Sequence, residues 1–109
     1  MCVVLKFNMS NPLLGRWSSR PSKNNIVTIV HFKADNSFEG FVNKKPFVTG
    51  TYQLDGTVMS FVDNGCNGAK GIYKLNFFSN GDSLRFEAVS DTCTERRKGM
   101  SALIMGKIK

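Results

Sequence analysis

The chain has 109 residues, enough for one domain that buries a core without a structural metal. Apolar residues make up 41% of it, which excludes global disorder, and the longest apolar run is far shorter than the ~20 residues of a membrane helix. The formal net charge of +7 favours anionic partners such as nucleic acid, lipid headgroups, acidic glycans or fatty carboxylates.

Turn signals recur at short intervals along the chain, a pattern typical of an all-β protein. Residues 1–11 are expected to form an N-terminal arm, and residues 12–109 a single domain. The expected strands are 12–19, 26–33, 38–43, 47–54, 57–63, 71–78, 83–89 and 102–109. Between the fourth and fifth strands, Asp55-Gly56 is typical of a two-residue type I′ hairpin.

One helical signal precedes the last strand. Thr92-Cys93-Thr94-Glu95 has the S/T-x-x-E form of a capping box, and Gly99 is placed to end a helix soon afterwards. We therefore expect at most one short helical turn, near residues 93–98.

Alternation along the expected strands places one set of apolar side chains on a common inward face. This set comprises Val30, Phe32, Phe38, Tyr52, Leu54, Met59, Phe61, Tyr73, Leu75, Phe77, Leu84, Phe86 and Ala88. Eight short strands joined by hairpins can close into a barrel, and closure removes the exposed edges of an open sheet. The sequence therefore predicts an all-β, eight-stranded antiparallel up-and-down barrel. Side chains alone can nearly fill the interior of a barrel of this size.

The segment Gly15-Arg16-Trp17 resembles the G-x-W motif that opens lipocalins and their calycin relatives. A hairpin over residues 32–38 and the later segments 50–52, 71–73 and 91–93 agree with short bacterial lipocalin-like domains, and the resemblance covers residues 12–109. It implies that Gly15 and Trp17 form a closed-end plug. Members of the family usually pack an arginine from the region of the last strand on the tryptophan ring. The last expected strand of this chain offers only Lys107 and Lys109. The alternative is a turn glycine followed by an ordinary core tryptophan.

Two cysteines follow the fifth and seventh expected strands, whose connections share one end of an up-and-down barrel. A Cys66–Cys93 disulfide fits this topology if the Cα atoms come within about 7 Å, and Cys2 is then unpaired. The disulfide would indicate an oxidising compartment, and hence a periplasmic, cell-surface or secreted protein. The alternative is three reduced thiols in a cytoplasmic protein.

The connections after the first, third, fifth and seventh strands carry eight basic and three acidic residues, a net charge of +5. The bases are Arg20, Lys23, Lys44, Lys45, Lys70, Arg96, Arg97 and Lys98, and the acids are Asp63, Asp91 and Glu95. We expect these bases to ring an open mouth and to steer anions toward it. The alternative is that the basic loops are merely solvated.

Catalytic and metal-binding patterns are absent from the sequence. It contains no G-x-S-x-G elbow, H-E-x-x-H helix or phosphate-binding glycine loop, and two distant cysteines with His31 fall short of four zinc ligands. We therefore expect neither an enzyme nor a cofactor or metal site.

The expected function is the binding of a small amphiphile, with its apolar part in the barrel and an anionic head at the basic mouth. The expected ligand-binding residues are Lys44, Lys45, Tyr52, Tyr73, Phe86, Arg96 and Arg97. The first alternative is a solidly filled barrel that serves as a protein-interaction or inhibitor module. An OB-like nucleic-acid binder ranks third, because most aromatic residues fall on the inward stripe rather than beside the bases.

Overall fold

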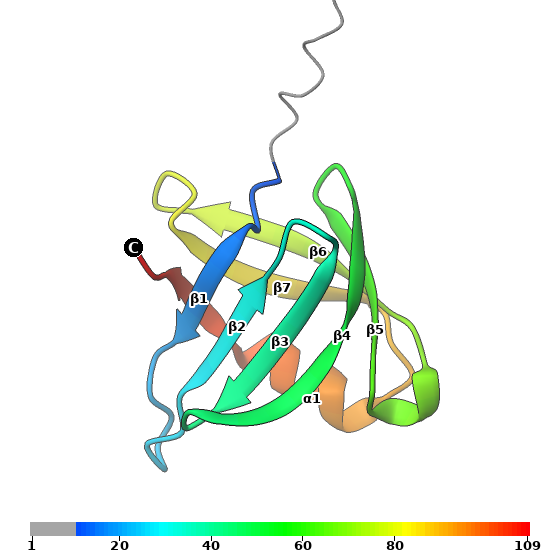
Figure 1. Cartoon of the computed structure of the whole chain (residues 1–109), viewed down its shortest axis with the longest axis horizontal. Coiled ribbons are helices and arrows are strands. Elements are labelled where there is room, and N and C mark those ends of the chain that lie inside the picture. The colour runs from blue at the N-terminus through cyan, green and yellow to red at the C-terminus, as the bar shows by residue number, and fades with distance from the viewer. Residues whose placement is uncertain (1–10) are drawn as a thin grey trace, which may run out of the picture.

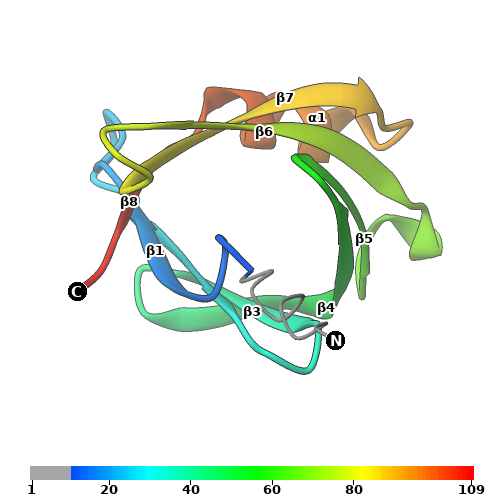
Figure 2. The same ribbon diagram turned by 90° about the horizontal axis from the view of Figure 1, so that it is seen from above.

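The structure, a computed structural model, describes residues 11–109 and shows a closed barrel of eight antiparallel strands (Figure 1). The strands are β1 (Gly15–Ser19), β2 (Thr28–Phe32), β3 (Ser37–Val42), β4 (Lys45–Asp55), β5 (Val58–Asp63), β6 (Gly71–Phe78), β7 (Ser83–Ser90) and β8 (Ile104–Lys107). Each strand pairs with the next along the chain, and β8 returns to pair with β1, so that Figure 2 shows a ring. The predicted up-and-down barrel is confirmed.

The first strand begins later than predicted. Residues 12–14 form a turn instead of extending the strand, and Gly15 then enters β1 with φ of +111°, a conformation that side chains disfavour. Of the expected N-terminal arm, residues 1–10 lie outside the described residues. Asn11 is fastened to the barrel, because its side-chain amide donates to the Tyr52 hydroxyl at 2.8 Å.

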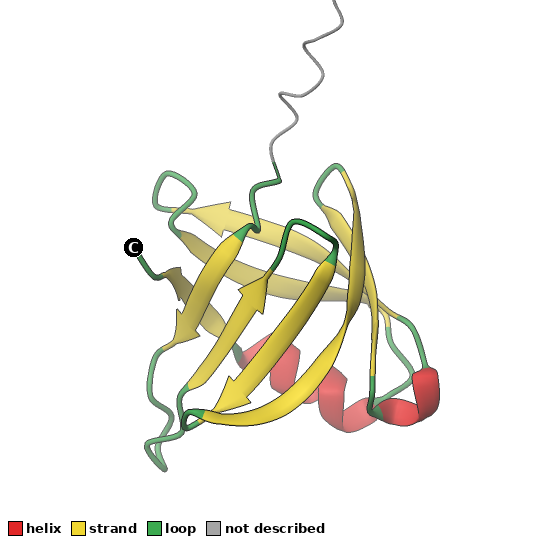
Figure 3. Ribbon diagram, viewed as in Figure 1, coloured by secondary structure: helices red, strands yellow, loops and turns green. Residues whose placement is uncertain are grey.

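The helical segment is longer than the single turn predicted near residues 93–98. Helix α1 (Thr94–Ala102) spans nine residues and includes Gly99. Figure 3 shows it in red at one end of the barrel. The capping box does not form, because no side chain caps the first turn and the Asp91 carboxylate instead accepts the Cys93 N–H at 3.0 Å. Met100 and Leu103 pack against the core, and such tertiary packing outweighs the low helix propensity of glycine.

The predicted inward face is confirmed along the strands. Its buried members are Phe32, Phe38, Tyr52, Met59, Phe61, Tyr73, Leu75, Leu84 and Phe86. Val30, Leu54, Phe77 and Ala88 are partly buried and pack against this core. Leu13 and Met105 complete the core, although strand alternation did not single them out.

Trp17 and the turn before β1 fill one end of the barrel. The Trp17 side chain is fully buried, and its Nε1–H donates to the Leu13 carbonyl at 2.9 Å. The Lys107 ammonium lies 5.5 Å from the Trp17 ring centroid, a cation–π distance. Lys107 thus takes the position where the lipocalin resemblance implies an arginine. We refer to this end as the closed end.

The opposite end is called the mouth below. It carries the β1–β2, β3–β4, β5–β6 and β7–β8 connections, and α1 lies at this end in Figure 1. A short 3-10 turn, η2 (Cys66–Gly68), lies within the β5–β6 connection. Within residues 11–109, the structure contains no helix with the length and apolar character needed to cross a membrane.

Two glycine substitutions test the packing in opposite directions. A Cβ at Gly50 would lie 2.1 Å from the Val62 carbonyl oxygen, so Gly50→Ala must displace backbone and should destabilise the protein by roughly 1–3 kcal/mol or more. A Cβ at Gly99 meets nothing within 4 Å, so Gly99→Ala should stabilise α1 by up to about 1 kcal/mol. Urea unfolding of both variants measures the two effects. A Gly50→Ala protein as stable as the wild type would contradict the packing described here.

Candidate functional site

The barrel interior contains a cavity of about 600 Å³. Its wall is mostly apolar and is drawn from several strands, including the side chains of Val30, Phe32, Phe38, Met59, Phe61 and Phe86. Met100 and Leu103 of the β7–β8 connection line it as well. The large aromatic core therefore leaves the barrel hollow, because Trp17 and Leu13 fill only the closed end.

The polar residues that line the cavity lie mainly at the mouth. Asp63 ends β5 and Asn64 follows it, while Glu95 and Arg96 belong to the first turn of α1. Phe47 also lines the cavity, although 71% of its surface is exposed. The cavity is thus apolar in depth and polar at one part of its rim, with an exposed aromatic ring at another.

A β-bulge explains the position of Phe47. Gly40 pairs with Val48 and Phe41 with Pro46, so Phe47 is an extra residue on β4. Strand alternation from Tyr52 and Leu54 would place Phe47 on the outer face. A bulge redirects the side chain of the extra residue, and here the ring reaches the edge of the cavity.

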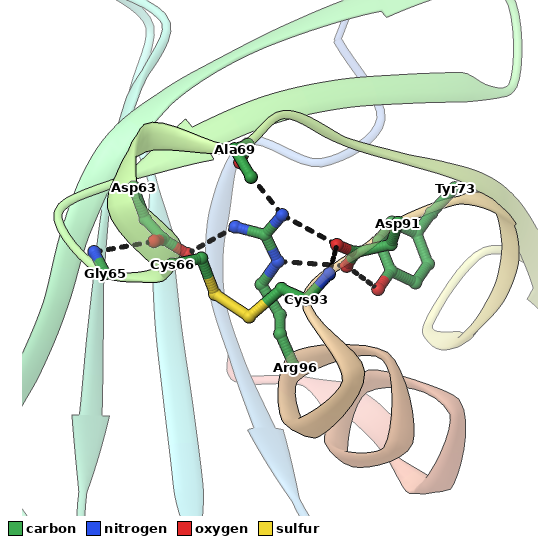
Figure 4. The surroundings of a disulfide bond; sticks show 8 residues. All are labelled: Asp63, Gly65, Cys66, Ala69, Tyr73, Asp91, Cys93 and Arg96. Carbon is green, nitrogen blue, oxygen red and sulfur yellow. Dashed lines mark hydrogen bonds and ion pairs between the residues drawn. A yellow bond between two sulfur atoms is a disulfide. The ribbon is translucent and has the colours of Figure 1, made fainter.

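Arg96, on the first turn of α1, forms the centre of a polar network whose partners surround its guanidinium in Figure 4. Its Nε donates to one Asp91 carboxylate oxygen at 2.9 Å and its Nη2 donates to the other at 2.8 Å. Asp91 also accepts hydrogen bonds from the Tyr73 hydroxyl and from the Cys93 N–H. The side chain of Asp91 has no exposed surface, so these donors replace the water that the carboxylate loses.

The same guanidinium reaches two further segments. Nη1 donates to the Asp63 carboxylate at 3.2 Å, and Nη2 donates to the Ala69 carbonyl at 2.9 Å. The guanidinium carbon also lies 4.8 Å from the centroid of the Phe61 ring. Arg96 therefore connects α1 to the end of β5, to the β5–β6 connection and to the segment after β7.

The network changes the proton affinities of its members. Burial by itself raises the pKa of Asp91, but hydrogen bonds from Arg96, Tyr73 and the Cys93 N–H outweigh it and lower this pKa to about 2. Burial and donation to Asp91 raise the pKa of the Tyr73 hydroxyl well above its ordinary value. Hydrogen bonding to Asp91 raises the pKa of Arg96. The network therefore stays charged as Asp91 carboxylate and Arg96 guanidinium at neutral pH.

The predicted Cys66–Cys93 disulfide is confirmed, with a Cα–Cα distance of 5.8 Å. It joins η2 to the residue directly before α1 and lies beside the Arg96 network (Figure 4). Covalent and ionic links thus fix the first turn of α1 to the β5–β6 connection. Cys2 lies outside the described residues.

The structure separates the predicted ligand-binding residues into groups. Phe86 and Arg96 line the cavity, but Arg96 is engaged by two carboxylates. The Tyr73 hydroxyl belongs to the network. The Tyr52 hydroxyl donates to the Lys33 carbonyl and so lies toward the closed end.

The predicted bases Lys44, Lys45 and Arg97 are exposed at the mouth and are not part of the cavity wall. Sequence reasoning missed Phe47, Met100 and Leu103 as lining residues and did not connect Asp91 with Arg96. The spacing Asp91-x-Cys93-x-x-Arg96 carried a signal for that pair. A carboxylate just before a helix can accept the helix's free N–H groups and also meet a base one turn further on.

The closed eight-stranded antiparallel barrel is compatible with a calycin-like fold. Comparison of the chain with protein-family models, with curated proteins and with solved structures finds no match. The inference of function therefore rests on the cavity and on the chemistry of the mouth.

Reduction of the disulfide should weaken the fold measurably. The cysteines are 27 residues apart in sequence, and a crosslink over such a loop contributes roughly 3–4 kcal/mol in the chain-entropy model. Urea unfolding with and without a dithiol reductant measures the difference. A Cys66→Ser/Cys93→Ser variant should match the reduced protein and show no response to reductant. Equal stability of oxidised and reduced wild type would contradict this prediction.

The Asp91 contacts should make stability depend on acid pH. The folded-state pKa of Asp91, about 2, lies below its ordinary value of 3.8, so this stabilisation is complete above about pH 4 and is lost as the pH falls toward 2. The difference corresponds to roughly 2 kcal/mol. Asp91→Asn should remove this part of the acid dependence in urea unfolding measured at successive pH values.

Asp55→Asn is the matched control, because Asp55 is exposed at the last position of β4, opposite Val58, and the positive φ of the following hairpin loop is taken by Gly56. An Asp91→Asn variant with the same pH profile as wild type would contradict the role of the network.

Arg96→Met should lower the free energy of unfolding by more, about 3–5 kcal/mol, since it leaves two buried carboxylates without their base.

Proposed function

We propose that this protein is a non-catalytic, lipocalin-like binding protein that holds a small amphiphile. The apolar part of the ligand occupies the barrel cavity and an anionic head lies at the mouth. The observation that carries the proposal is the cavity of about 600 Å³ with its largely apolar wall. Small-molecule sites of about 300–1,000 Å³ with apolar walls and a few polar groups are typical of binding proteins.

The distribution of polar groups supports an amphiphilic ligand. The deep wall consists of residues such as Phe32, Phe38 and Met59, whereas charged lining residues gather at the mouth. A ligand with one apolar and one polar end matches this gradient, because an apolar chain gains by leaving water and a charged head stays in it.

The preference for an anionic head arises from exposed bases around the mouth. Arg96 is compensated by Asp63 and Asp91, so it offers no free charge to a ligand. Lys44, Lys45 and Arg97 are exposed and act from the rim. Their attraction to an anion is therefore screened by salt and weaker than a buried ion pair.

The competing functions have less support. A solidly filled barrel would leave no cavity of this size. An OB-fold is a five-stranded Greek-key barrel, and the observed eight-stranded sequential order differs from it. Arg96, Asp63 and Asp91 are engaged with one another, which favours a structural role over catalysis for these polar groups.

The disulfide supports a cellular compartment for this protein. Disulfides persist in oxidising compartments, so we propose a periplasmic, cell-surface or secreted protein. A binding protein there would meet its amphiphile outside the reducing cytoplasm.

Titration with a fluorescent fatty acid and with its methyl ester tests the proposal. The acid should bind roughly three- to tenfold more tightly at low salt, and the two affinities should converge at high salt. Val30→Trp should reduce binding of both probes at least about tenfold, because the indole occupies cavity space and a displaced ligand loses its apolar contacts.

Val89→Trp is the control, since Val89 is 61% exposed and is not part of the cavity wall. It should leave both affinities unchanged. Native mass spectrometry of purified protein adds an independent observation, because a copurified ligand would appear as added mass. Absence of binding by either probe, or unchanged binding in Val30→Trp, would contradict the cavity as the ligand site.

A further inference from the structure

Two apolar side chains project from adjacent segments of the mouth. Phe47 is 71% exposed on the bulge of β4, and Ile26 is 39% exposed in the β1–β2 connection. The two segments are joined, because the Val27 N–H donates to the Asn43 side chain and the Asn43 N–H donates to the Val27 carbonyl, both at 2.9 Å. Phe47 and Ile26 therefore lie on two segments that are hydrogen-bonded to each other at the mouth, and we call these two exposed side chains the apolar lip.

Basic residues flank this lip on both segments. Arg20 and Lys23 belong to the β1–β2 connection, Lys44 belongs to the β3–β4 turn and Lys45 begins β4; all four are exposed. Lys44 has φ of +72°, in the region that favours glycine, after Asn43 at +51°. A type I′ turn is most relaxed with Asn-Gly, so the lysine charge is presented at a conformational cost.

The buried network removes negative charge from the same surface. Asp63, at the end of β5, and Asp91 are two of the three acids predicted to lie at the mouth, and their side chains, paired with Arg96, are 8% and 0% exposed. Glu95 is the remaining acid and is exposed. The same end of the barrel carries seven exposed bases, namely Arg20, Lys23, Lys44, Lys45, Lys70, Arg97 and Lys98. Arg96 thus pairs with two acids below the surface, and the outer surface of the mouth is left strongly basic.

We propose that the mouth docks on an anionic phospholipid bilayer. Phe47 and Ile26 enter the interfacial region, and the flanking bases meet the lipid phosphates. An aromatic and an aliphatic side chain surrounded by basic residues match the surface of an anionic bilayer. There, the free energy of burying the apolar side chains adds to the attraction between the bases and the anionic lipid. Single-stranded nucleic acid fits less well, because it is usually held by several aromatic stacking platforms, and this lip presents one ring.

This inference goes beyond the proposed function and concerns a different partner. With the mouth against the bilayer, the cavity opens toward the lipid instead of toward water. An amphiphile could then pass between membrane and cavity without crossing the aqueous phase. The cavity and the lip remain separable, because Val30 lines the cavity in the barrel and Phe47 lies at its rim.

Co-sedimentation with vesicles tests the docking. Wild type should bind phosphatidylcholine vesicles that contain a minor share of phosphatidylglycerol, bind pure phosphatidylcholine much less, and lose binding as salt rises. Lys44→Gly/Lys45→Gln should weaken binding about thirtyfold, and Phe47→Ser about tenfold. Lys44→Gly relieves the positive φ, so thermal unfolding should show no loss of stability in the first variant.

Lys74→Gln/Arg85→Gln removes the same number of charges from the outer faces of β6 and β7, away from the lip, and should change vesicle binding by less than about threefold. Val30→Trp should retain vesicle binding, so failure of docking is distinguished from failure of ligand binding. Equal binding to neutral and anionic vesicles, an equal loss in the control, or tighter binding of a single-stranded oligonucleotide than of anionic vesicles would each overturn the proposal.

Discussion

Closure of the sheet is the constraint on which the rest of this structure depends. The seam between β1 and β8 is short, joining Trp17, Ser18 and Ser19 to Lys107, Gly106 and Met105. Trp17 and Met105 are buried beside it, and Lys107 covers the indole ring, so side-chain packing supports a seam with few backbone pairs. Once the sheet closes in sequential order, alternate connections must gather at opposite ends. The mouth and the closed end follow from this rule.

The gathering of connections at the mouth creates the contacts that hold α1. Cys66 and Cys93 meet only because the β5–β6 and β7–β8 connections share that end, and Arg96 reaches Asp63 for the same reason. The helix buries none of its residues completely, and the packing of Met100 and Leu103 lies at its C-terminal end, so apolar contacts do not fix its first turn. A disulfide and a buried ion-pair network hold its first turn instead, and they keep Met100 and Leu103 at the cavity.

The arrangement also separates charge by depth. Arg96, Asp63 and Asp91 lie beneath the surface, and the remaining bases of the mouth lie outside. Burial of an ion pair adds little net stability against an apolar replacement, but a broken pair is costly. The network therefore fixes the position of α1. As a second effect, it leaves a basic outer surface around an apolar opening. Ligand binding and membrane docking are both proposed from this combination.

Period-two alternation determined the all-β class and the inward face, because each strand buries one side and exposes the other. Short hairpin connections predicted the sequential order of the strands. Turn-forming residues determined most strand boundaries, and the sequential topology led to the Cys66–Cys93 pairing. Only the tertiary structure decided the turn over residues 12–14, the full length of α1 and the bulge that turns Phe47 to the mouth. It also decided that Arg96 forms ion pairs with both Asp63 and Asp91, and that the aromatic core leaves a cavity. These features depend on contacts between segments distant in sequence and on how side-chain volumes fill a closed space, and local patterning carries neither.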